Sequence, residues 1–178
     1  MVEVKLYKTP FKGLKIFALT IPFVIIGVCM IMKEPAGSFY YIAGWACVGF
    51  FGLGIPVGLF QTFDRRPQII ITENGIWDRT TNQDEIKWEQ ITEVYSLDIY
   101  GQKFISLNVD ETFVMKQKLY KWAEKLNETI GAQKVNLSIS QLKIDEYRMT
   151  NFIADMINSN RQNRQFVIKK YFPLYTTL

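Results

Sequence analysis

Hydrophobic residues form two long uninterrupted runs in the first third of the chain and short alternating stretches after it. No residue from Ile16 to Met32 is charged, and none from Pro35 to Phe63 is charged. About 20 mainly apolar residues suffice for a helix to cross the roughly 30 Å hydrocarbon core of a membrane. The pattern therefore predicts two transmembrane helices, at about residues 14–32 and 39–62. The short loop "KEPAGS" between them predicts an antiparallel helical hairpin.

Basic residues flank this predicted hairpin on one side. Before the first helix stand Lys5, Lys8, Lys12 and Lys15, and after the second stand Arg65 and Arg66. Because cytoplasmic flanks are rich in Lys and Arg, we expect a multi-pass protein with both ends in the cytoplasm and these six bases at the membrane lipids. A cleaved signal peptide is the alternative, since a basic start precedes an apolar run, but a second and longer run follows at once.

The hairpin carries features of helix packing and none of transport. Gly54 and Gly58 form a GxxxG pair, which permits close approach of helices. This pair is either the seam of a homodimer or docking face, or a packing contact within the hairpin. Pro22 and Pro56 can kink their helices. No charged side chain interrupts either span, so we interpret the hairpin as an anchor or docking element.

From Gln68 onward the hydrophobic period becomes that of strands. "QIIIT" and "IWDRTT" flank Asn74-Gly75, which predicts a tight hairpin turn with positive φ angles. "EIKWEQITEVYSL" predicts one long strand or two, with Ile86 and Trp88 on one face. A turn around Gly101 and the strand "KFISLNV" complete an antiparallel meander of four or five strands.

Two helices and one more strand follow the meander. An apolar stripe at helical spacing predicts a helix over residues 113–130. "KVNLSI" predicts a strand, and a second helix should follow Asp145 with its inner face formed by Met149, Phe152, Ile153, Met156 and Ile157. We therefore expect a membrane α-helical hairpin (1–66), an antiparallel α+β domain with two helices (67–160) and a basic, aromatic tail (161–178).

Three motifs carry a resemblance to a known family. The chain exit "DRRP", the turn "ENGI" and the strand "IKWEQI" resemble those of small bacterial inner-membrane proteins of unknown function, with an N-terminal two-helix hairpin and a cytoplasmic pleckstrin-homology-like domain. The resemblance extends to about residue 160. It implies a bacterial inner-membrane location and a pleckstrin-homology-like fold, but these motifs are structural and imply no catalytic residue.

The residue types needed for common chemistries are absent or misplaced. The chain has no histidine, and both cysteines lie inside the apolar runs. The glycine-rich "GLGIPVG" also lies there and lacks the lysine of a phosphate-binding loop. Carboxylates cluster in one strand region at Asp84, Glu85, Glu89 and Glu93. Two such groups can hydrolyse a glycoside, but the alternation of the sequence favours the solvated face of a strand. We predict no enzyme activity, no metal site and no cofactor.

The basic residues of the soluble part give two open interpretations. They lie on the first soluble helix and in the tail: Lys118, Lys121, Lys125, Arg161, Arg164, Lys169 and Lys170. They are either contacts to a protein partner or lipid headgroup, or solvated charges. Bases and acids nearly balance from Asp64 onward, which argues against nucleic acid as a partner.

The expected function is recognition of a protein partner or lipid headgroups by a non-enzymatic, membrane-anchored domain. The alternative is an immunity protein that neutralises a secreted antibacterial toxin at the inner membrane. Small size, a membrane hairpin and the lack of catalytic residues fit both.

Overall fold

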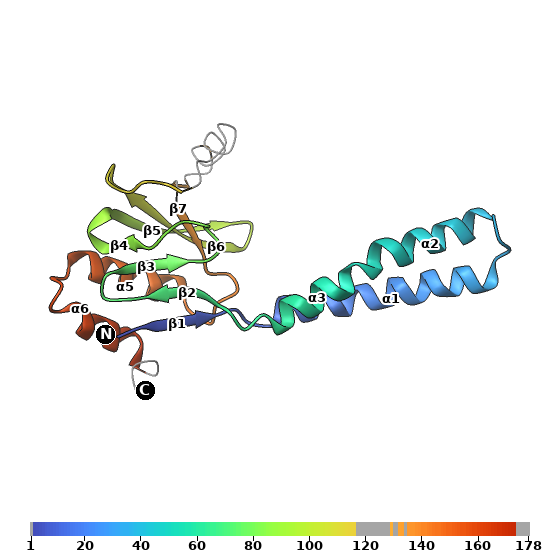
Figure 1. The fold of residues 1–178 in the computed structure, drawn as a ribbon, viewed down its shortest axis with the longest axis horizontal. Helices are drawn as coiled ribbons and strands as arrows, with labels where there is room; N and C mark the ends of the chain where they lie inside the picture. Colours follow the sequence, from blue (N-terminus) through green and yellow to red (C-terminus); the bar gives the residue numbers. More distant parts are fainter. Residues whose placement is uncertain (1, 117–128, 130–131, 134, 174–178) are drawn as a thin grey trace. The chain divides into compact units, whose positions relative to one another are not determined.

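The computed structural model describes residues 2–116, 129, 132–133 and 135–173, which fall into two compact units. One unit is Thr9–Arg65, and the other combines Met1–Lys8 with Arg66–Leu178. Together they form an N-terminal helical pair followed by antiparallel sheets and helices, an α+β arrangement (Figure 1). The expected hairpin domain of residues 1–66 is therefore too long at its start, because residues 4–7 form a strand of the second unit.

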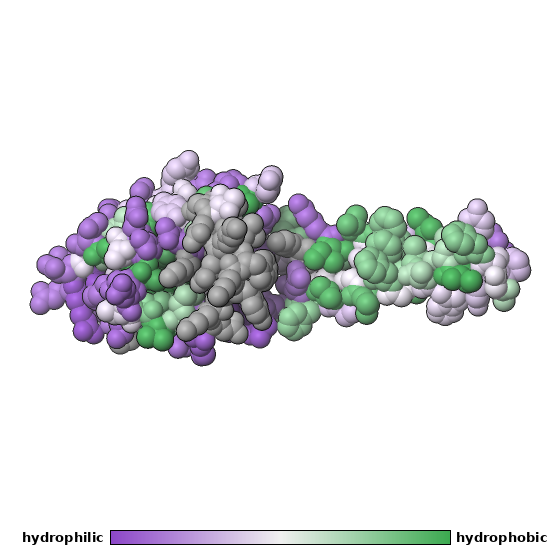
Figure 2. All heavy atoms as spheres, turned by 90° about the horizontal axis from the view of Figure 1, so that it is seen from above, coloured by the Kyte–Doolittle hydropathy of each residue, from purple (hydrophilic) through white to green (hydrophobic). Residues whose placement is uncertain are grey.

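The first unit is a helical hairpin of α1 (Phe11–Lys33), α2 (Phe39–Gly52) and α3 (Gly54–Phe63). α2 and α3 are separated only at Leu53. The break lies here because Pro56 has no N–H to donate to the carbonyl of Gly52, four residues earlier. The stretches Gly13–Lys33 and Phe39–Phe63 are long and apolar enough to cross a membrane, as the sequence predicts. Figure 2 shows apolar side chains along this unit and polar side chains over the α+β unit.

Two pairs of glycines let the helices of the hairpin approach each other. A Cβ atom on Gly27 would lie 2.9 Å from the carbonyl oxygen of Gly44, and one on Gly44 would lie 2.8 Å from that of Gly27. A Cβ atom on Gly13 would lie 2.7 Å from the carbonyl oxygen of Gly58. Backbone stands against backbone at both crossings, so a side chain at any of these positions would push the helices apart.

The second unit begins with a four-stranded antiparallel sheet. Its strands lie in the order β1 (Val4–Tyr7), β2 (Pro67–Ile71), β3 (Gly75–Asp78) and β4 (Ile86–Lys87). The chain leaves this sheet at the end of β1 and returns, after the hairpin, to the neighbouring strand β2. Sequence analysis missed β1, whose residues alternate between buried and exposed.

A second antiparallel sheet contains β5 (Ile91–Ile99), β6 (Gln102–Val109) and β7 (Val135–Ser138) in that order. A 3₁₀ turn at Trp88–Gln90 separates β4 from β5, so the stretch "EIKWEQITEVYSL" forms two strands, which lie in different sheets. The turn between β5 and β6 is the one predicted around Gly101, which has a φ of 77°.

α5 (Glu146–Asn158) covers the core with the predicted face. Met149, Phe152, Ile153 and Met156 on this helix are fully buried. Phe152 contacts Trp88 edge to face at a ring-centroid distance of 5.9 Å. The indole N–H of Trp88 donates to the carbonyl of Thr72 at 3.0 Å, which satisfies the polar group of this buried side chain.

The C-terminal region up to Pro173 belongs to the same core. α6 (Arg164–Tyr171) buries Ile168, and Phe172 behind it is 4% exposed. The rings of Phe152 and Phe172 lie 5.0 Å apart. The separation of residues 161–178 as a tail is therefore corrected for 161–173, because their apolar side chains pack on α5.

The turn between β2 and β3 differs from the one predicted at Asn74-Gly75. Neither Asn74 nor Gly75 has a positive φ; instead, Thr72 Oγ1 accepts hydrogen bonds from both of their N–H groups, at 3.1 Å each. Gly75 is needed for close packing, because a Cβ atom there would lie 2.3 Å from the carbonyl oxygen of Ile86 on β4. The helix predicted over residues 113–130 falls mostly outside the described residues, and 113–116 are not helical.

Candidate functional site

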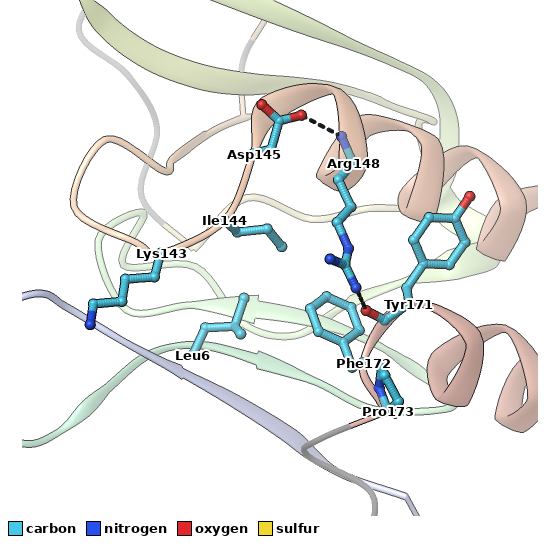
Figure 3. Close-up of a pocket in the computed structure, with 8 residues that line it drawn as sticks. All are labelled: Leu6, Lys143, Ile144, Asp145, Arg148, Tyr171, Phe172 and Pro173. Atoms are coloured by element: carbon cyan, nitrogen blue, oxygen red, sulfur yellow. Dashed lines mark hydrogen bonds between the residues drawn. The ribbon is translucent and has the colours of Figure 1, made fainter.

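A pocket of about 390 Å³ lies where β1, the start of α5 and the end of α6 meet (Figure 3). Its apolar lining comes from Leu6, Ile144, Phe172 and Pro173, and its polar lining from Lys143, Asp145, Arg148 and Tyr171. These residues come from both ends of the sequence, and the pairing of β1 with β2 and the bridge of Lys8 to Leu142 bring Leu6 to the others.

Helix capping holds the polar groups of the pocket in place. Asp145 is the N-cap of α5, and its carboxylate accepts hydrogen bonds from the N–H groups of Tyr147 at 3.0 Å and Arg148 at 3.1 Å. The guanidinium of Arg148 donates through Nη2 to the carbonyl of Tyr171 at the end of α6. Figure 3 shows this guanidinium beside Phe172, on the same side of the pocket as Tyr171.

The pocket carries an excess of one positive charge. Lys143 and Arg148 are both exposed, and Asp145 supplies the one negative charge of the lining. Arg148 uses one donor on Tyr171 and retains others, since a guanidinium has five. Lys143 and Arg148 can therefore bind an anionic group next to the apolar side chains that line the pocket.

The end of α6 is fixed to α5 by a small polar cluster next to the pocket. The carboxylate of Asp155 accepts hydrogen bonds from the Tyr171 hydroxyl at 2.9 Å and from Lys170 Nζ at 3.1 Å. These two bonds hold the pKa of Asp155 below its usual value. Burial raises the pKa of Tyr171, and the bond to Asp155 acts in the same direction. The cluster is a structural link that orients the Tyr171 backbone toward Arg148.

A second polar cluster lies at the end of the unit where the chain leaves for the hairpin. Leu6 pairs with Ile69 and Tyr7 with Pro67, so Gln68 is an extra residue in β2 and forms a bulge. The bulge turns the Gln68 side chain inward, where its Nε2 donates to the carbonyl of Ser138 at the end of β7. This hydrogen bond ties the strand that returns from the hairpin to the second sheet.

Asp78 on β3 joins the same cluster. Its carboxylate accepts hydrogen bonds from the Thr80 N–H at 2.7 Å and the Thr80 hydroxyl at 2.8 Å. Burial raises the pKa of Asp78, although the bonds from Thr80 and Ser138 and the charge of Lys8 oppose the shift. The group is enclosed in the core, with 2% of its surface exposed, and we assign it a structural role.

The six bases expected at the membrane surface have different surroundings. Lys5 lies in β1 and pairs with Glu3 at 3.2 Å. Lys8 forms an isolated bridge with Leu142, and Lys12 and Lys15 lie in the first two turns of α1. Arg65 and Arg66 are exposed between α3 and β2. Five of these bases thus lie next to the hairpin helices in the chain, whereas Lys5 is part of the sheet.

The two glycines predicted to pack helices both face α1 within the hairpin. A Cβ atom on Gly54 would lie 2.2 Å from Cγ2 of Thr20, and one on Gly58 would lie 3.0 Å from the backbone nitrogen of Phe17. These contacts correspond to the interpretation as packing inside the hairpin. Sequence analysis missed Gly13 and Gly27, which stand alone in α1 without a GxxxG spacing.

The bases expected to contact a partner also divide into groups. Arg164 is only 4% exposed and donates to Glu89 at 2.6 Å and to the Glu73 carbonyl at 3.3 Å, so its expected role as a surface contact is wrong. Arg161 donates to Asn74 Oδ1 at 3.0 Å. Lys169 is exposed on α6, whereas Lys170 pairs with Asp155. Lys118, Lys121 and Lys125 lie outside the described residues.

The acidic strand region contains ion pairs and hydrogen bonds rather than a convergent site. Glu89 pairs with Arg164, Asp84 pairs with Lys116 at 3.1 Å, and Glu85 accepts a hydrogen bond from Thr72 at 2.8 Å. Within residues 2–116 and the described part of 129–173, no three Asp, Glu or Cys side chains are grouped so that they could hold a metal ion.

Comparisons with known proteins return nothing for this chain: no protein-family model, no curated protein and no solved structure matches it.

Proposed function

We propose that this chain is a non-enzymatic, membrane-anchored binding protein, whose α+β unit recognises an anionic ligand at the pocket beside α5. The hairpin supports the anchoring half of the proposal. Only 11% of the apolar window of each long helix is buried by the rest of the chain. A core helix of a soluble protein would be mostly buried, and an apolar surface of this extent is a membrane or protein interface.

The observation that carries the membrane topology of the proposal is the insertion of the hairpin between two paired strands. Val4, Lys5 and Leu6 pair with Ile71, Ile70 and Ile69 of β2. Residues before and after the hairpin therefore lie on one side of the membrane, which requires an even number of crossings. A cleaved signal peptide fits poorly, because cleavage in the loop after α1 would remove Val4 and Leu6 from the core.

The remaining parts of the proposal follow from chemistry and resemblance. Lys8, Lys15, Arg65 and Arg66 beside the hairpin favour the cytoplasmic side of an inner membrane for the α+β unit. The four-stranded sheet, the three-stranded sheet and the helix α5 support the pleckstrin-homology-like fold, because both sheets are antiparallel and α5 covers their core. That fold serves many functions, so the binding role rests on the pocket itself.

The pocket would accept an anionic group attached to an apolar one. A protein carboxyl terminus and a lipid headgroup both have this chemistry. Lys143 and Arg148 would pair with the anion, and Leu6 and Phe172 would contact the apolar part.

The test is affinity capture of the tagged full chain from its membrane in mild detergent, with analysis of both bound proteins and bound lipids. The matched variants are Lys143→Glu in the pocket and Lys169→Glu on α6, and both replace an exposed base. We expect one enriched protein or acidic lipid species that is lost with Lys143→Glu and retained with Lys169→Glu. Equal recovery with both variants would refute the pocket as the binding site. A captured toxin would place the chain among immunity proteins.

A further inference from the structure

Several strand ends of the α+β unit gather where the chain leaves for the hairpin. β1 ends beside the bridge between Lys8 and Leu142, and the bulge in β2 is tied to Ser138. Ser138 pairs with Phe104 at the start of β6. The N–H of Lys103 donates to Ser140 Oγ at 2.6 Å. The turn before β6 therefore lies at this same end of the unit.

This turn exposes an aromatic side chain in an unfavourable backbone conformation. Tyr100 has a φ of 51° and Gly101 a φ of 77°, as two-residue hairpin turns of type I′ require. Asn, Asp and Gly are the residues suited to the first position, whereas a bulky residue at positive φ is an outlier. The Tyr100 side chain is fully exposed, at 103% relative accessibility, so no packing within the described chain compensates for the strain.

Short connectors join this end of the unit to the helices of the hairpin. Lys8 and the start of α1 are separated by Thr9 and Pro10, and α3 and β2 by Asp64–Arg66. Three residues span at most about 10 Å. If the hairpin spans a membrane, as the proposed function requires, Lys8 and Arg66 each lie within about 10 Å of the end of a membrane-spanning helix.

We propose that Tyr100 inserts into the interface of the same membrane and gives the α+β unit a second contact with the lipid surface. Tyrosine is enriched at this depth because its ring is apolar and its hydroxyl is polar. A residue with a strained backbone persists at a functional site only where the surrounding structure holds it in that conformation. Here the eight residue pairs of β5 and β6 hold the turn at Tyr100. The occupant we infer is a bilayer with anionic phospholipids.

The charges at this end fit an anionic surface. Lys8, Lys143, Arg65 and Arg66 are the bases next to the exit, and Lys103 pairs with Glu146 at 2.9 Å. The acids are Asp64, Asp145 and Asp98, of which Asp98 is directed back to the Gly101 N–H at 2.7 Å. Asp78 at the same end is enclosed in the core, and the exposed bases Arg65 and Arg66 directly precede β2.

The test uses the full chain in nanodiscs of phosphatidylethanolamine and phosphatidylglycerol, labelled with an environment-sensitive fluorophore. In a background with Cys29→Ala and Cys47→Ala, the label is placed at Gln102→Cys beside the turn, so that Tyr100 is retained. The control position is Glu111→Cys, because Glu111 follows β6 at the opposite end of the ladder, about 24 Å away for a strand of this length. Both positions are exposed in the structure.

We expect blue-shifted emission and protection from aqueous iodide at position 102, and neither at position 111. Tyr100→Asn should abolish the protection while preserving the turn, because Asn tolerates positive φ. Tyr100→Trp should retain it. Thermal unfolding at an unchanged or higher temperature would show that Tyr100→Asn is folded.

Two results would overturn the inference: equal iodide access at positions 102 and 111, or protection at 102 that survives Tyr100→Asn. Anchoring is read separately in a chain that carries Cys47→Ala alone, from a label on native Cys29, an exposed residue of α1. If the Cys29 label is protected and position 102 is not, the anchoring remains and the second contact is refuted. If the Cys29 label is open to iodide, the anchoring itself is refuted.

Discussion

Replacing Val4 with alanine tests whether the segment before the hairpin belongs to the core of the α+β unit. Val4 is fully buried and pairs with the fully buried Ile71. The substitution removes two methyl groups, which contribute about 0.8 kcal/mol each by transfer. A residual cavity of roughly 40 Å³ would add about 1 kcal/mol at 24 cal/mol per Å³. We therefore expect a destabilisation of about 2.5 kcal/mol.

The measurement is thermal unfolding of the full chain in nanodiscs, followed by intrinsic tryptophan fluorescence, to which buried Trp88 contributes. A unit of about 120 residues loses roughly 4 °C in Tm per kcal/mol, so Val4→Ala should lower Tm by about 10 °C. The matched control is Lys5→Ala, which removes an exposed side chain and a surface ion pair from the same strand. It should change stability by less than about 0.5 kcal/mol. If Val4→Ala lowers Tm no more than Lys5→Ala does, residues 4–7 are not core residues, and the argument for an even number of membrane crossings fails.

Three other substitutions test separate features. Gly13→Leu should disrupt the hairpin, because its Cβ meets the backbone of Gly58, whereas Gly49→Leu, with open space around it, should be neutral. The readout is the protease resistance of the hairpin in the membrane. Equal resistance of the two variants would contradict the packing. Asp78→Asn should remove a pH dependence. The folded-state pKa of Asp78 is raised above its unfolded value, so its contribution to stability is greatest below the unfolded pKa of about 4 and declines as pH rises through the folded pKa. Relative to the variant, the wild type should lose stability in thermal unfolding as the pH rises above about 4; parallel curves would contradict this. Arg164→Ala should lower the free energy of unfolding by about 2 kcal/mol, because the hydrogen bonds to Glu89 and to a backbone carbonyl are lost. Arg164→Met should recover part of this loss by filling the space. Chemical denaturation measures both variants, and equal destabilisation would show that packing contributes little at this position.

The long apolar runs and the apolar stripe of α5 were predictable because each is a local pattern. Both hairpin spans and the buried face from Met149 to Met156 follow from periodicity over many residues. β1 was missed because four residues are too few for a clear alternation, and its lysine was interpreted together with the other bases before the hairpin. The function of Gly75 was misjudged because Asn-Gly is a strong turn signal, whereas the close approach of Ile86 depends on the pairing of β3 with β4.

The pocket could not be predicted, because no local stretch contains it. Leu6 and Phe172 come together only after β1 joins the sheet and α6 packs on α5. Arg164 shows the opposite error: a base among polar residues looks solvated in the sequence, but the burial of Ile168 and Phe172 draws its helix onto the core. The pocket and the burial of Arg164 both depend on tertiary contacts between distant segments.

The placement of the hairpin between β1 and β2 has a consequence for the order in which the protein matures. β1 is synthesised before the hairpin, and its partner strand β2 is synthesised after it. In water, joining the two strands would close a loop of more than fifty residues, at an entropic cost of roughly 3.5 kcal/mol. If the hairpin inserts into a bilayer, as we propose, insertion would bring the two ends of that loop together before the sheet forms. Membrane insertion and folding of the α+β unit would then be one coupled process, and chains that fail to insert should also fail to complete their first sheet.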